Sequence, residues 1–342
     1  MPNEELLHVT HVGPSPSDIG GMESVLRVYE RARWSQLSIS VLPSTSRARR
    51  LDKIRLVARA VRILRKGSDG PVHVHLSQRG SFVREGLISV VAGKSRPVFA
   101  TIHGSDFVAT AHGFKWRWLY GRILRRMRGI AVLNESALAT ARALAPEVPV
   151  CILANPGSDA ILPVSPRSSH RVVFAGEVGY RKGVDVLVKA WSKVREAVPD
   201  AQLDILGPIG DLDGVTLEAA APYLRGSATP EEVSGYLGRA SCAVLPSRAE
   251  GQPMFLIEAL GHGLPIVATE VGGMPGLASG SGLVVAVGAV DDLAAAIITV
   301  LTQEAVADRY AAHALERYLN EFSPSAHERG LMRLYDGASA HD

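Results

Sequence analysis

The chain has 342 residues, of which 46% are apolar and 21% are charged, and its formal net charge is +3. This length is enough for two domains of ordinary size, and the composition is ordinary for a soluble globular protein. No apolar run reaches the roughly 18 residues of a membrane-spanning helix, and residues 1–7 lack the basic-then-apolar form of a signal peptide. A membrane-spanning or secreted protein is therefore not expected.

The chain contains two cysteines, Cys151 and Cys242, and each lies in an apolar, strand-like run. This usage favours thiols in a reducing compartment over a disulfide framework. It predicts a cytoplasmic protein.

The charge is divided unevenly along the chain. Residues 1–157 hold 23 basic against 11 acidic side chains, a balance of +12, whereas residues 158–342 hold 14 against 23, a balance of −9. Such asymmetry indicates that the first half faces an acidic surface or an acidic substrate.

The first predicted strand, residues 6–13, leads into a loop with Gly20, Gly21 and Glu23, after which a helical pattern begins. A strand, a glycine turn and a helix N-terminus form the phosphate-binding arrangement of doubly wound folds. A double glycine alone is equally compatible with a plain tight turn.

Strands and helices then alternate along the first half. Strands are predicted at 38–42, 72–76, 97–103, 130–134 and 150–155, with helices at about 49–65 and 82–92. Helices of this length between strands predict βαβ units on a parallel sheet, hence the α/β class. Residues 155–169 are rich in Pro, Gly and Ser and are predicted to link two such domains.

One histidine lies where such a sheet gathers ligands. His103 follows the apolar strand 98–102, and loops after strands carry sites more often than strand interiors do. His73 and His75 are two residues apart and so share one strand face. No third ligand with metal-site spacing accompanies them, so a structural role is predicted for that pair.

The segment Arg47–Lys66 is strongly basic, with Asp52 as its one acid and apolar residues at helical spacing. A basic amphipathic helix can lie on an anionic membrane, whereas a solvated helix face is the plainer alternative. A second basic cluster, Lys115 to Arg128, contains two tryptophans and no acid. Nucleic acid is disfavoured as a partner, because no binding motif accompanies the charge.

The second half begins again with a strand, 171–175, a glycine-containing loop, and a helix, 184–198. Arg181 and Lys182 lie in that loop, where their charges and the helix N-terminus suit a diphosphate. Further strands are predicted at 202–207, 242–245, 265–269 and 283–286, and helices at 230–239, 291–301, 305–319 and about 326–335. Asp211 and Asp213 lie in a Gly-rich loop and are interpreted as a solvated turn.

The most informative stretch runs from Ser247 to Gly273. Glu250 precedes a short helix opened by Pro253, and Glu258 lies inside that helix among apolar neighbours. A carboxylate in such surroundings is costly to bury unless it is hydrogen-bonded. The N–H groups at Gln252 to Phe255 provide an anion site at the helix start. An anionic ligand that carries hydroxyl groups would be held at several points.

This stretch resembles the signature of the retaining family-4 glycosyltransferases of the GT-B fold, the glycogen-synthase-like or group 1 superfamily. Seven residues separate Glu250 from Glu258, and the likeness continues through 261–269 and 272–275. The resemblance implies two Rossmann-like domains facing each other across a cleft. It places the acceptor domain at 1–157, with a helix at 322–342 packing back on it, and the nucleotide-sugar domain at 158–321.

The resemblance also implies roles for individual residues. The catalytic set would be His103, Glu250, Lys182 and Arg181. The donor-binding set would be Glu258, Gly251, Gln252, Pro253, Met254 and Phe255, with Arg225 and Gly226 beside the base. Phosphate or acceptor contacts would come from Gly20, Gly21, Glu23 and Asn134. Two positions depart from the family pattern: Glu177 replaces an Arg, and Gly276 replaces a Glu.

The expected function is transfer of a sugar, with retention, from a UDP- or GDP-linked donor, without a cofactor or essential metal. The basic first half favours a sugar or lipid-linked anionic acceptor in cell-envelope glycolipid or polysaccharide assembly. The expected location is the cytoplasm, with the inner face of the membrane as an option. A non-catalytic GT-B subunit or scaffold that binds sugar nucleotides is the alternative. An epimerase or phosphorylase on the same architecture is disfavoured.

Overall fold

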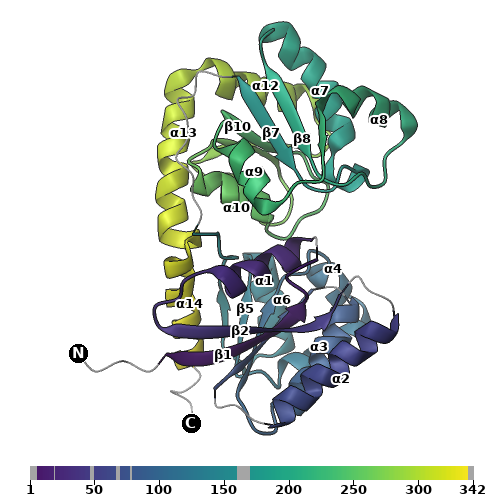
Figure 1. Cartoon of the computed structure of the whole chain (residues 1–342), viewed down its shortest axis with the longest axis vertical. Coiled ribbons are helices and arrows are strands. Elements are labelled where there is room, and N and C mark those ends of the chain that lie inside the picture. The colour runs from purple at the N-terminus through teal and green to yellow at the C-terminus, as the bar shows by residue number, and fades with distance from the viewer. Residues whose placement is uncertain are drawn as a thin grey trace, which may run out of the picture. The chain divides into compact units, whose positions relative to one another are not determined.

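The computed structural model describes residues 6–18, 20–46, 50–66, 70–77, 79–159 and 170–337. The chain divides into two units: residues 1–156 together with 323–342, and residues 157–322. The expected boundaries differ from this division by one residue at each junction. Each unit is an α/β structure with its own sheet (Figure 1).

The first unit contains a six-stranded parallel sheet in the order β2-β1-β3-β4-β5-β6. Its strands are β1 (Leu7–Pro14), β2 (Leu37–Thr45), β3 (Val72–Leu76), β4 (Val98–Ile102), β5 (Gly129–Val132) and β6 (Val150–Ile152). Its helices are α1 (Gly21–Arg31), α2 (Arg50–Lys66), α3 (Arg79–Ala92), α4 (Phe107–Ala111), α5 (Phe114–Leu124), α6 (Glu135–Leu144) and α14 (Pro324–Gly337). The order reverses direction beside β1, as doubly wound folds require.

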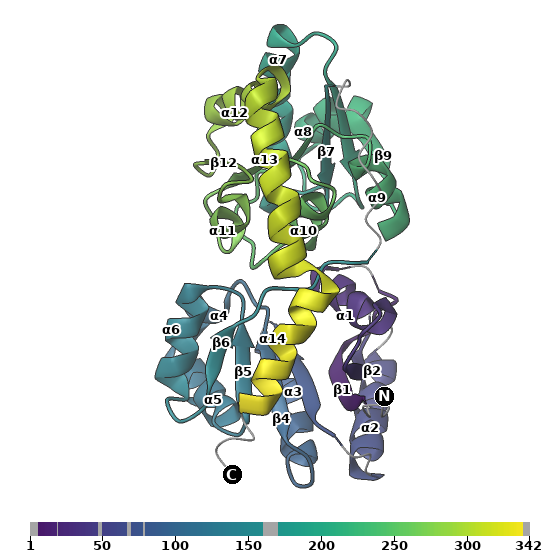
Figure 2. The same ribbon diagram turned by 90° about the vertical axis from the view of Figure 1, so that its left-hand side faces the viewer.

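The two faces of this first sheet differ in chemistry because side chains alternate along a strand. Val72, Val74 and Leu76 of β3 point into an apolar core that also contains residues of α2 and α3. His73 and His75 point to the other face, where α1 and α14 bring aromatic rings against them. α14 packs on this sheet beside β5 (Figure 2).

α14 is fastened to the start of β2 by one carboxylate. Glu328 accepts hydrogen bonds from the backbone N–H groups of Ser35, Gln36 and Leu37 at 3.1, 2.7 and 3.1 Å. Burial acts to raise the pKa of Glu328, but these bonds outweigh it and lower the pKa. A C-terminal segment thus becomes part of the first unit.

The second unit repeats the parallel plan in the order β12-β11-β10-β7-β8-β9. Its strands are β7 (Arg171–Ala175), β8 (Gln202–Leu206), β9 (Leu224–Gly226), β10 (Cys242–Leu245), β11 (Ile266–Thr269) and β12 (Gly282–Val285). Its α-helices are α7 (Val184–Ala197), α8 (Gly214–Ala220), α9 (Pro230–Leu237), α10 (Met254–Gly261), α11 (Met274–Ala278), α12 (Val290–Thr302) and α13 (Glu304–Arg317). α7 and α12 lie side by side (Figure 2).

Each predicted element has an observed counterpart, in most cases with different ends, whereas α4, α5, α6, α8 and α11 were not predicted. The helix expected to open at Pro253 begins at Met254, because Pro253 takes the cap position. The strand expected to reach Asn134 ends at Val132, since Asn134 caps α6. Across the described part of the chain, every helix is too short or too polar to cross a bilayer.

Candidate functional site

The centre of the candidate site is an ion pair at the carboxyl edge of the second sheet. Nζ of Lys182, from the loop after β7, lies 2.6 Å from Oε1 of Glu250, from the loop after β10, and the two side chains are only 13% and 10% exposed. Nη1 of Arg181 lies 3.4 Å from the same oxygen, and Oγ of Ser247 donates to it at 3.1 Å. Two motifs far apart in the sequence therefore meet at one carboxylate.

Gly183 allows the β7 and β10 loops to approach, and Gly176 makes room for Lys182 within the β7 loop. Gly176 has φ of +154°, and a Cβ there would lie 3.3 Å from Cε of Lys182, so the lysine stem runs across this glycine. Gly183 has φ of +74°, and a Cβ there would overlap the carbonyl oxygen of Pro246. A left-handed conformation with a neighbouring backbone in contact admits only glycine. The loops consequently touch through their backbones.

The Gly-rich loop after β11 contacts the backbone of Glu250 and Gly251. Gly272 has φ of +56°, and a Cβ there would overlap the carbonyl oxygen of Glu250. The N–H of Gly273 donates to the carbonyl of Gly251 at 2.6 Å. The double glycine of the motif therefore holds the backbone that carries the acid.

Arg248 fastens the β7 and β10 loops and was not predicted. Its guanidinium donates two hydrogen bonds to Asp185, at 2.7 and 2.8 Å, and lies 3.7 Å from the ring centre of Tyr180. The hydrogen bonds that Arg248 donates to Asp185 raise the pKa of Arg248. The backbone N–H of Arg248 also donates to the carbonyl of Arg181 at 2.8 Å. No sequence signal joins Arg248 to Asp185, because the partners are 63 residues apart.

The helix that follows Glu250 offers backbone donors to the same region. In α10, the N–H groups of Leu256 and Ile257 donate to the carbonyl of Pro253 at 3.2 and 3.4 Å. Met254 and Phe255 precede these bonds, so their N–H groups belong to the unpaired first turn of the helix. Such a turn attracts anions. Gly251 and Gln252 complete the loop between Glu250 and this turn.

Glu258 lies half-buried in α10 on the side of Tyr318. Burial, followed by the charges of Asp159 and Glu258, raises the pKa of the Tyr318 hydroxyl. The Tyr318 ring packs against Gly261, where a Cβ would lie 2.9 Å from Cε2 of the ring. The Glu258 carboxylate is therefore half-buried and near enough to Tyr318 for its charge to act on that hydroxyl.

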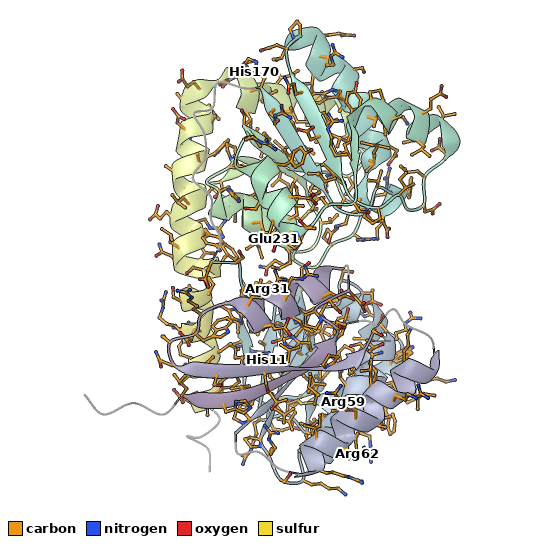
Figure 3. The ribbon with its side chains drawn as sticks, in the orientation of Figure 1. His11, Arg31, Arg59, Arg62, His170 and Glu231 are labelled. Carbon is orange, nitrogen blue, oxygen red and sulfur yellow. The ribbon has the colours of Figure 1, made fainter. Side chains whose placement is uncertain are left out.

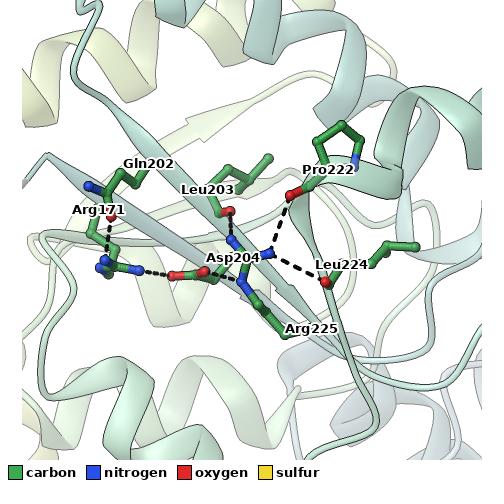
Figure 4. Close-up of polar contacts among 7 residues, drawn as sticks. All are labelled: Arg171, Gln202, Leu203, Asp204, Pro222, Leu224 and Arg225. Atoms are coloured by element: carbon green, nitrogen blue, oxygen red, sulfur yellow. Dashed lines mark hydrogen bonds and ion pairs between the residues drawn. The ribbon is translucent and has the colours of Figure 1, made fainter.

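Arg225 is engaged in a structural cluster (Figure 4). Its Nε donates to Oδ1 of Asp204 at 2.6 Å, and its other guanidinium nitrogens donate to the carbonyls of Leu203, Pro222 and Leu224. Arg171 binds the second oxygen of Asp204. Gly226 follows with φ of +80° and open space around it. The arginine donors are thus occupied by β8 and its neighbouring turn.

The two departures from the family pattern also have definite places. The Glu177 side chain lies against Gly210, where a Cβ would come 2.7 Å from its Cγ, and it is exposed. At Gly276 the carbonyl accepts a hydrogen bond from Arg317 at 2.9 Å, and a side chain would meet open space. Nη1 of Arg181, in the same loop as Glu177, lies 3.4 Å from Oε1 of Glu250.

In the first unit, the predicted phosphate loop forms the start of α1. Gly20 is the N-cap of this helix, and the Glu23 carboxylate folds back over Gly20, so that a Cβ there would overlap it. Gly21 has open space around its Cα. Arg27 holds the preceding loop by donating to the carbonyls of Pro16 and Asp18 at 3.0 and 2.9 Å. Ile19 lies outside the described residues.

Asn134 has a visible structural role. Its Oδ1 accepts hydrogen bonds from the backbone N–H of Ala137 at 2.9 Å and from the hydroxyl of Ser136 at 2.7 Å. This is the N-cap interaction that stabilises α6. The side-chain oxygen is thereby used within the first unit.

His103 lies at the end of a row of buried imidazoles. Its Nε2 is 2.8 Å from Nδ1 of His75, and Nε2 of His75 is 2.8 Å from Nδ1 of His11. His11 comes from β1, in the interior of the unit (Figure 3). His73 instead bonds Tyr335 at 2.9 Å and Thr101 at 2.7 Å. The described residues contain no cluster of three or more His, Cys, Asp or Glu able to hold a metal.

Burial is the main cause of the low basicity of these histidines. It lowers the pKa of His73 to about 3 and that of His103 to about 4, and it lowers the pKa of His11 and His75 well below the usual value. Neighbouring imidazoles lower the pKa of His11, His73 and His75 further. The Asn155 side chain opposes the shift at His103. All four rings are therefore neutral near pH 7.

Two basic surfaces lie on the first unit. On α2, Lys53, Arg59 and Arg62 are exposed together with Ile54, which is 66% exposed, and Figure 3 places Arg59 and Arg62 along this helix. Arg47 and the two residues after it lie near this helix in sequence, but residues 47–49 are outside the described part. On α5, Phe114 and Trp118 are 85% and 62% exposed. A hollow of about 550 Å³ beside them is lined by Arg117, Arg122, Arg125 and Arg126.

Comparison with known proteins places these features in context. Residues 169–303 match the family described as glycosyl transferases group 1. A D-inositol 3-phosphate glycosyltransferase from Arthrobacter sp. (strain FB24) is 35% identical over 35% of this chain and 31% of its own length. Glycogen synthase from Mycobacterium tuberculosis (strain ATCC 25618 / H37Rv) is 28% identical over 66% of this chain and 59% of its own length. The chain thus spans about a third to three-fifths of these curated relatives.

Solved structures resemble the whole chain. Sucrose-phosphate synthase from Thermosynechococcus elongatus superposes with a TM-score of 0.76 at 17% identity, covering 98% of this chain and 100% of that one. Anabaena Alr3699/HepE in complex with UDP-glucose gives a TM-score of 0.73 at 15% identity, covering 97% and 100%. At such identities the likeness establishes the fold alone. It confirms the predicted α/β class and the GT-B architecture.

Proposed function

Because residues 169–303 form a domain of the glycosyl transferases group 1 family, we propose that this protein is a glycosyltransferase that uses a nucleotide-sugar donor. The second unit would bind the donor. The ion pair between Lys182 and Glu250 carries the proposal, because it joins the two halves of the expected site at 2.6 Å in a largely buried position.

The residues around this pair suit a diphosphate leaving group. Lys182 and Arg181 supply positive charge, and the first turn of α10 at Met254 and Phe255 supplies N–H donors. Donors arranged in advance stabilise the negative charge that develops on a leaving group. In the structure Lys182 is paired with Glu250 at 2.6 Å. A bound diphosphate would take over the lysine and release Glu250 toward sugar hydroxyls or the positive charge at the anomeric carbon.

The remaining donor contacts follow from their positions. Glu258 would accept hydrogen bonds from ribose hydroxyls, and 251–253 would lie along the phosphates. Arg225 would contribute its backbone and Gly226 beside the base, since the guanidinium is held by Asp204. The solved neighbours in complex with UDP and with UDP-glucose favour a UDP-linked donor over a GDP-linked one.

Retention of configuration and independence of metal belong to the same proposal. Lys182, Arg181 and the first turn of α10 would together neutralise the diphosphate, so a divalent cation would not be needed. Turnover that survives EDTA supports this. Turnover that is lost in EDTA and restored by magnesium contradicts it.

The acceptor is proposed to be anionic and lipid-linked, in cell-envelope assembly, with the first unit at the inner face of the membrane. The basic side chains of α2 and α5, together with exposed Phe114 and Trp118, suit an anionic bilayer. The name of the D-inositol 3-phosphate glycosyltransferase relative also indicates an anionic acceptor. Co-sedimentation with phosphatidylglycerol vesicles but not with phosphatidylcholine vesicles is expected, and it should weaken as salt rises.

A screen of UDP-, GDP- and ADP-sugars by thermal shift identifies the donor, and release of the nucleotide measures turnover. Lys182→Ala is expected to lower turnover by about 10²–10³-fold, as removal of one charge-stabilising donor does. Lys189→Ala is the matched control, because this lysine is exposed on α7 beyond the site. Near-normal turnover in Lys182→Ala would remove Lys182 from the site.

The alternative is a non-catalytic subunit that binds sugar nucleotides. Glu177 and Gly276 favour it, because they replace residues that the active family members usually carry. A donor that raises the melting temperature but is neither hydrolysed nor transferred would support this alternative.

A further inference from the structure

Three histidines form a continuous hydrogen-bonded row across the first sheet. The row runs from His103 after β4, through His75 in β3, to His11 in β1, with 2.8 Å between ring nitrogens at both steps. Parallel register explains the alignment: His11 is paired with His73, and His75 is paired with Thr101. Their side chains therefore share one face of the sheet, and His103 continues it two residues beyond Thr101.

The surroundings keep this row uncharged. His11 and His75 are fully buried. The groups that face them are His73, Tyr29 and the row itself, with ring centres 4.2 to 5.3 Å apart, and His327 acts from α14. Desolvation disfavours the imidazolium form, and each charged neighbour would disfavour it further. Each of the three rings therefore carries a single N–H near pH 7.

A row of neutral imidazoles has only two arrangements that keep both hydrogen bonds. In one, all three rings are protonated on Nδ1, so that His11 donates to His75 and His75 donates to His103. In the other, all three are protonated on Nε2 and both bonds run the opposite way. The ring at one end decides the tautomer at the other end.

The ends of the row differ in what an N–H would meet. Nε2 of His11 is buried and has no hydrogen-bond partner among the described residues. Nδ1 of His103 is also buried and lacks a hydrogen bond of ordinary geometry among the described residues, but the Asn155 side chain beside it acts as a hydrogen-bonding neighbour that raises the pKa of His103. A buried donor without an acceptor is costly. The N–H belongs at the end where an acceptor can reach it, which is Nδ1 of His103.

We propose that His11 and His75 are positioning residues that hold His103 in its Nδ1–H tautomer, so that His103 donates a hydrogen bond from Nδ1 to a substrate oxygen. The substrate contact of His103 rests on the function proposed above, whereas the tautomer does not. His103 then acts as a donor that keeps its proton. No bond is made or broken in this role.

The tautomers can be read directly in the whole protein. Imidazole ¹⁵N chemical shifts at pH 7.5, recorded on histidine-labelled protein without substrate, distinguish a protonated from a bare ring nitrogen. Protonated Nδ1 on His11, His75 and His103 is expected. Protonated Nε2 on any of the three overturns the proposal, whether or not the protein transfers a sugar.

Substitutions at His75 separate positioning from packing. His75→Leu is expected to lower kcat about tenfold, with little change in the KM for the donor, because His103 loses its fixed tautomer. His75→Asn keeps an amide donor near the position of Nδ1 and is expected to restore most of kcat. His73→Leu is the matched control: it removes a buried imidazole from the same strand face, outside the row, and should leave kcat unchanged. Equal losses in His75→Leu and His73→Leu would contradict the positioning role.

Substitutions at His103 test which ring nitrogen donates the hydrogen bond to the substrate. Asn places an amide near the position of Nδ1, and Gln places one near the position of Nε2. His103→Asn should retain at least tenfold more kcat than His103→Gln. Equal or reversed activities would overturn donation from Nδ1. Absence of transfer by the unsubstituted protein would refute the proposed function and leave the ¹⁵N result to decide the tautomer.

Discussion

The two units share one topology but differ in what their sheets bury. Each has six parallel strands in a doubly wound order. In the first unit one face of the sheet carries His11, His73 and His75, and all three are fully buried. In the second unit the clearest buried charge is Asp204, which lies between Arg171 and Arg225. One face of the first sheet thus buries neutral imidazoles, whereas the second unit buries an aspartate paired with two arginines.

This difference predicts which change destabilises each unit. Neutral imidazoles are stable only while they remain unprotonated, so the first unit depends on pH. The second unit depends on close backbone contacts among its loops, which glycine permits and larger residues do not. Four perturbations test the contrast.

Acidification is expected to destabilise the first unit most. The pKa of His73 and of His327 is lowered to about 3 and that of His103 to about 4, whereas an exposed histidine titrates near 6.5. Between these values the unfolded chain binds more protons, so stability is full above about pH 6.5 and falls as the pH drops toward 4. At about 1.4 kcal/mol per unit of pKa shift, the loss should exceed about 5 kcal/mol. Melting followed by domain-specific NMR signals from pH 7.5 to 4 measures it. Earlier acid melting of the second unit would contradict the contrast.

Gly183→Ala is expected to destabilise the second unit by about 3 kcal/mol or more, since it combines a positive φ with an overlap at Pro246. Urea denaturation measures the change. Gly235→Ala in α9 is the control, because its Cβ would meet nothing within 4 Å and alanine favours a helix by roughly 0.5–1 kcal/mol. Equal stability of the two variants would show that the loops move apart without cost.

Arg248→Lys is expected to cost about 1–2 kcal/mol and to weaken donor binding. Lysine cannot make the paired hydrogen bonds to Asp185 or stack on Tyr180 in the same way. Thermal melting and donor titration measure the two effects. Arg239→Lys is the control on α9's C-terminal side, where the guanidinium lies over the ring of Tyr236. An unchanged donor affinity in Arg248→Lys would mean that this clamp does not shape the site.

Asn134→Ala is expected to cost about 1 kcal/mol through loss of the α6 cap, and Asn134→Ser should recover most of it. Urea denaturation of the two variants measures this. If Asn134 also contacts substrate, both variants should lower turnover although only the alanine variant is destabilised. Normal turnover in both would leave the cap as its role.

Much of the fold could be read from residue pattern. β3 alternates Val and His, β7 and β10 are short apolar runs, and Pro253 with its glycine neighbours marks the loop before α10. The candidate donor site was predicted from a family resemblance, which local motifs around Glu250, Glu258 and Lys182 carry. These signals are local: each depends on neighbours within a few residues.

Other features could be decided only by the tertiary structure. The sequence assigned His103 to a loop and His73 and His75 to a common face, but it did not separate them. Strand register places His75 in the row with His103 and His11. His73 instead forms hydrogen bonds with Thr101 and Tyr335. In the same way Arg225 became a partner of Asp204 and Asn134 a helix cap.

The amino-acid pattern was sufficient for the strands and the longer helices, for the glycines that the loops require, and for the resemblance of the second unit to the group 1 glycosyl transferases. The tertiary structure decided which side chains meet: Lys182 with Glu250, Arg248 with Asp185, and three imidazoles in one row. The reason is the distance along the chain over which each interaction acts. Backbone preferences and alternating burial act over a few residues, whereas a hydrogen bond between distant segments depends on how neighbouring strands are paired.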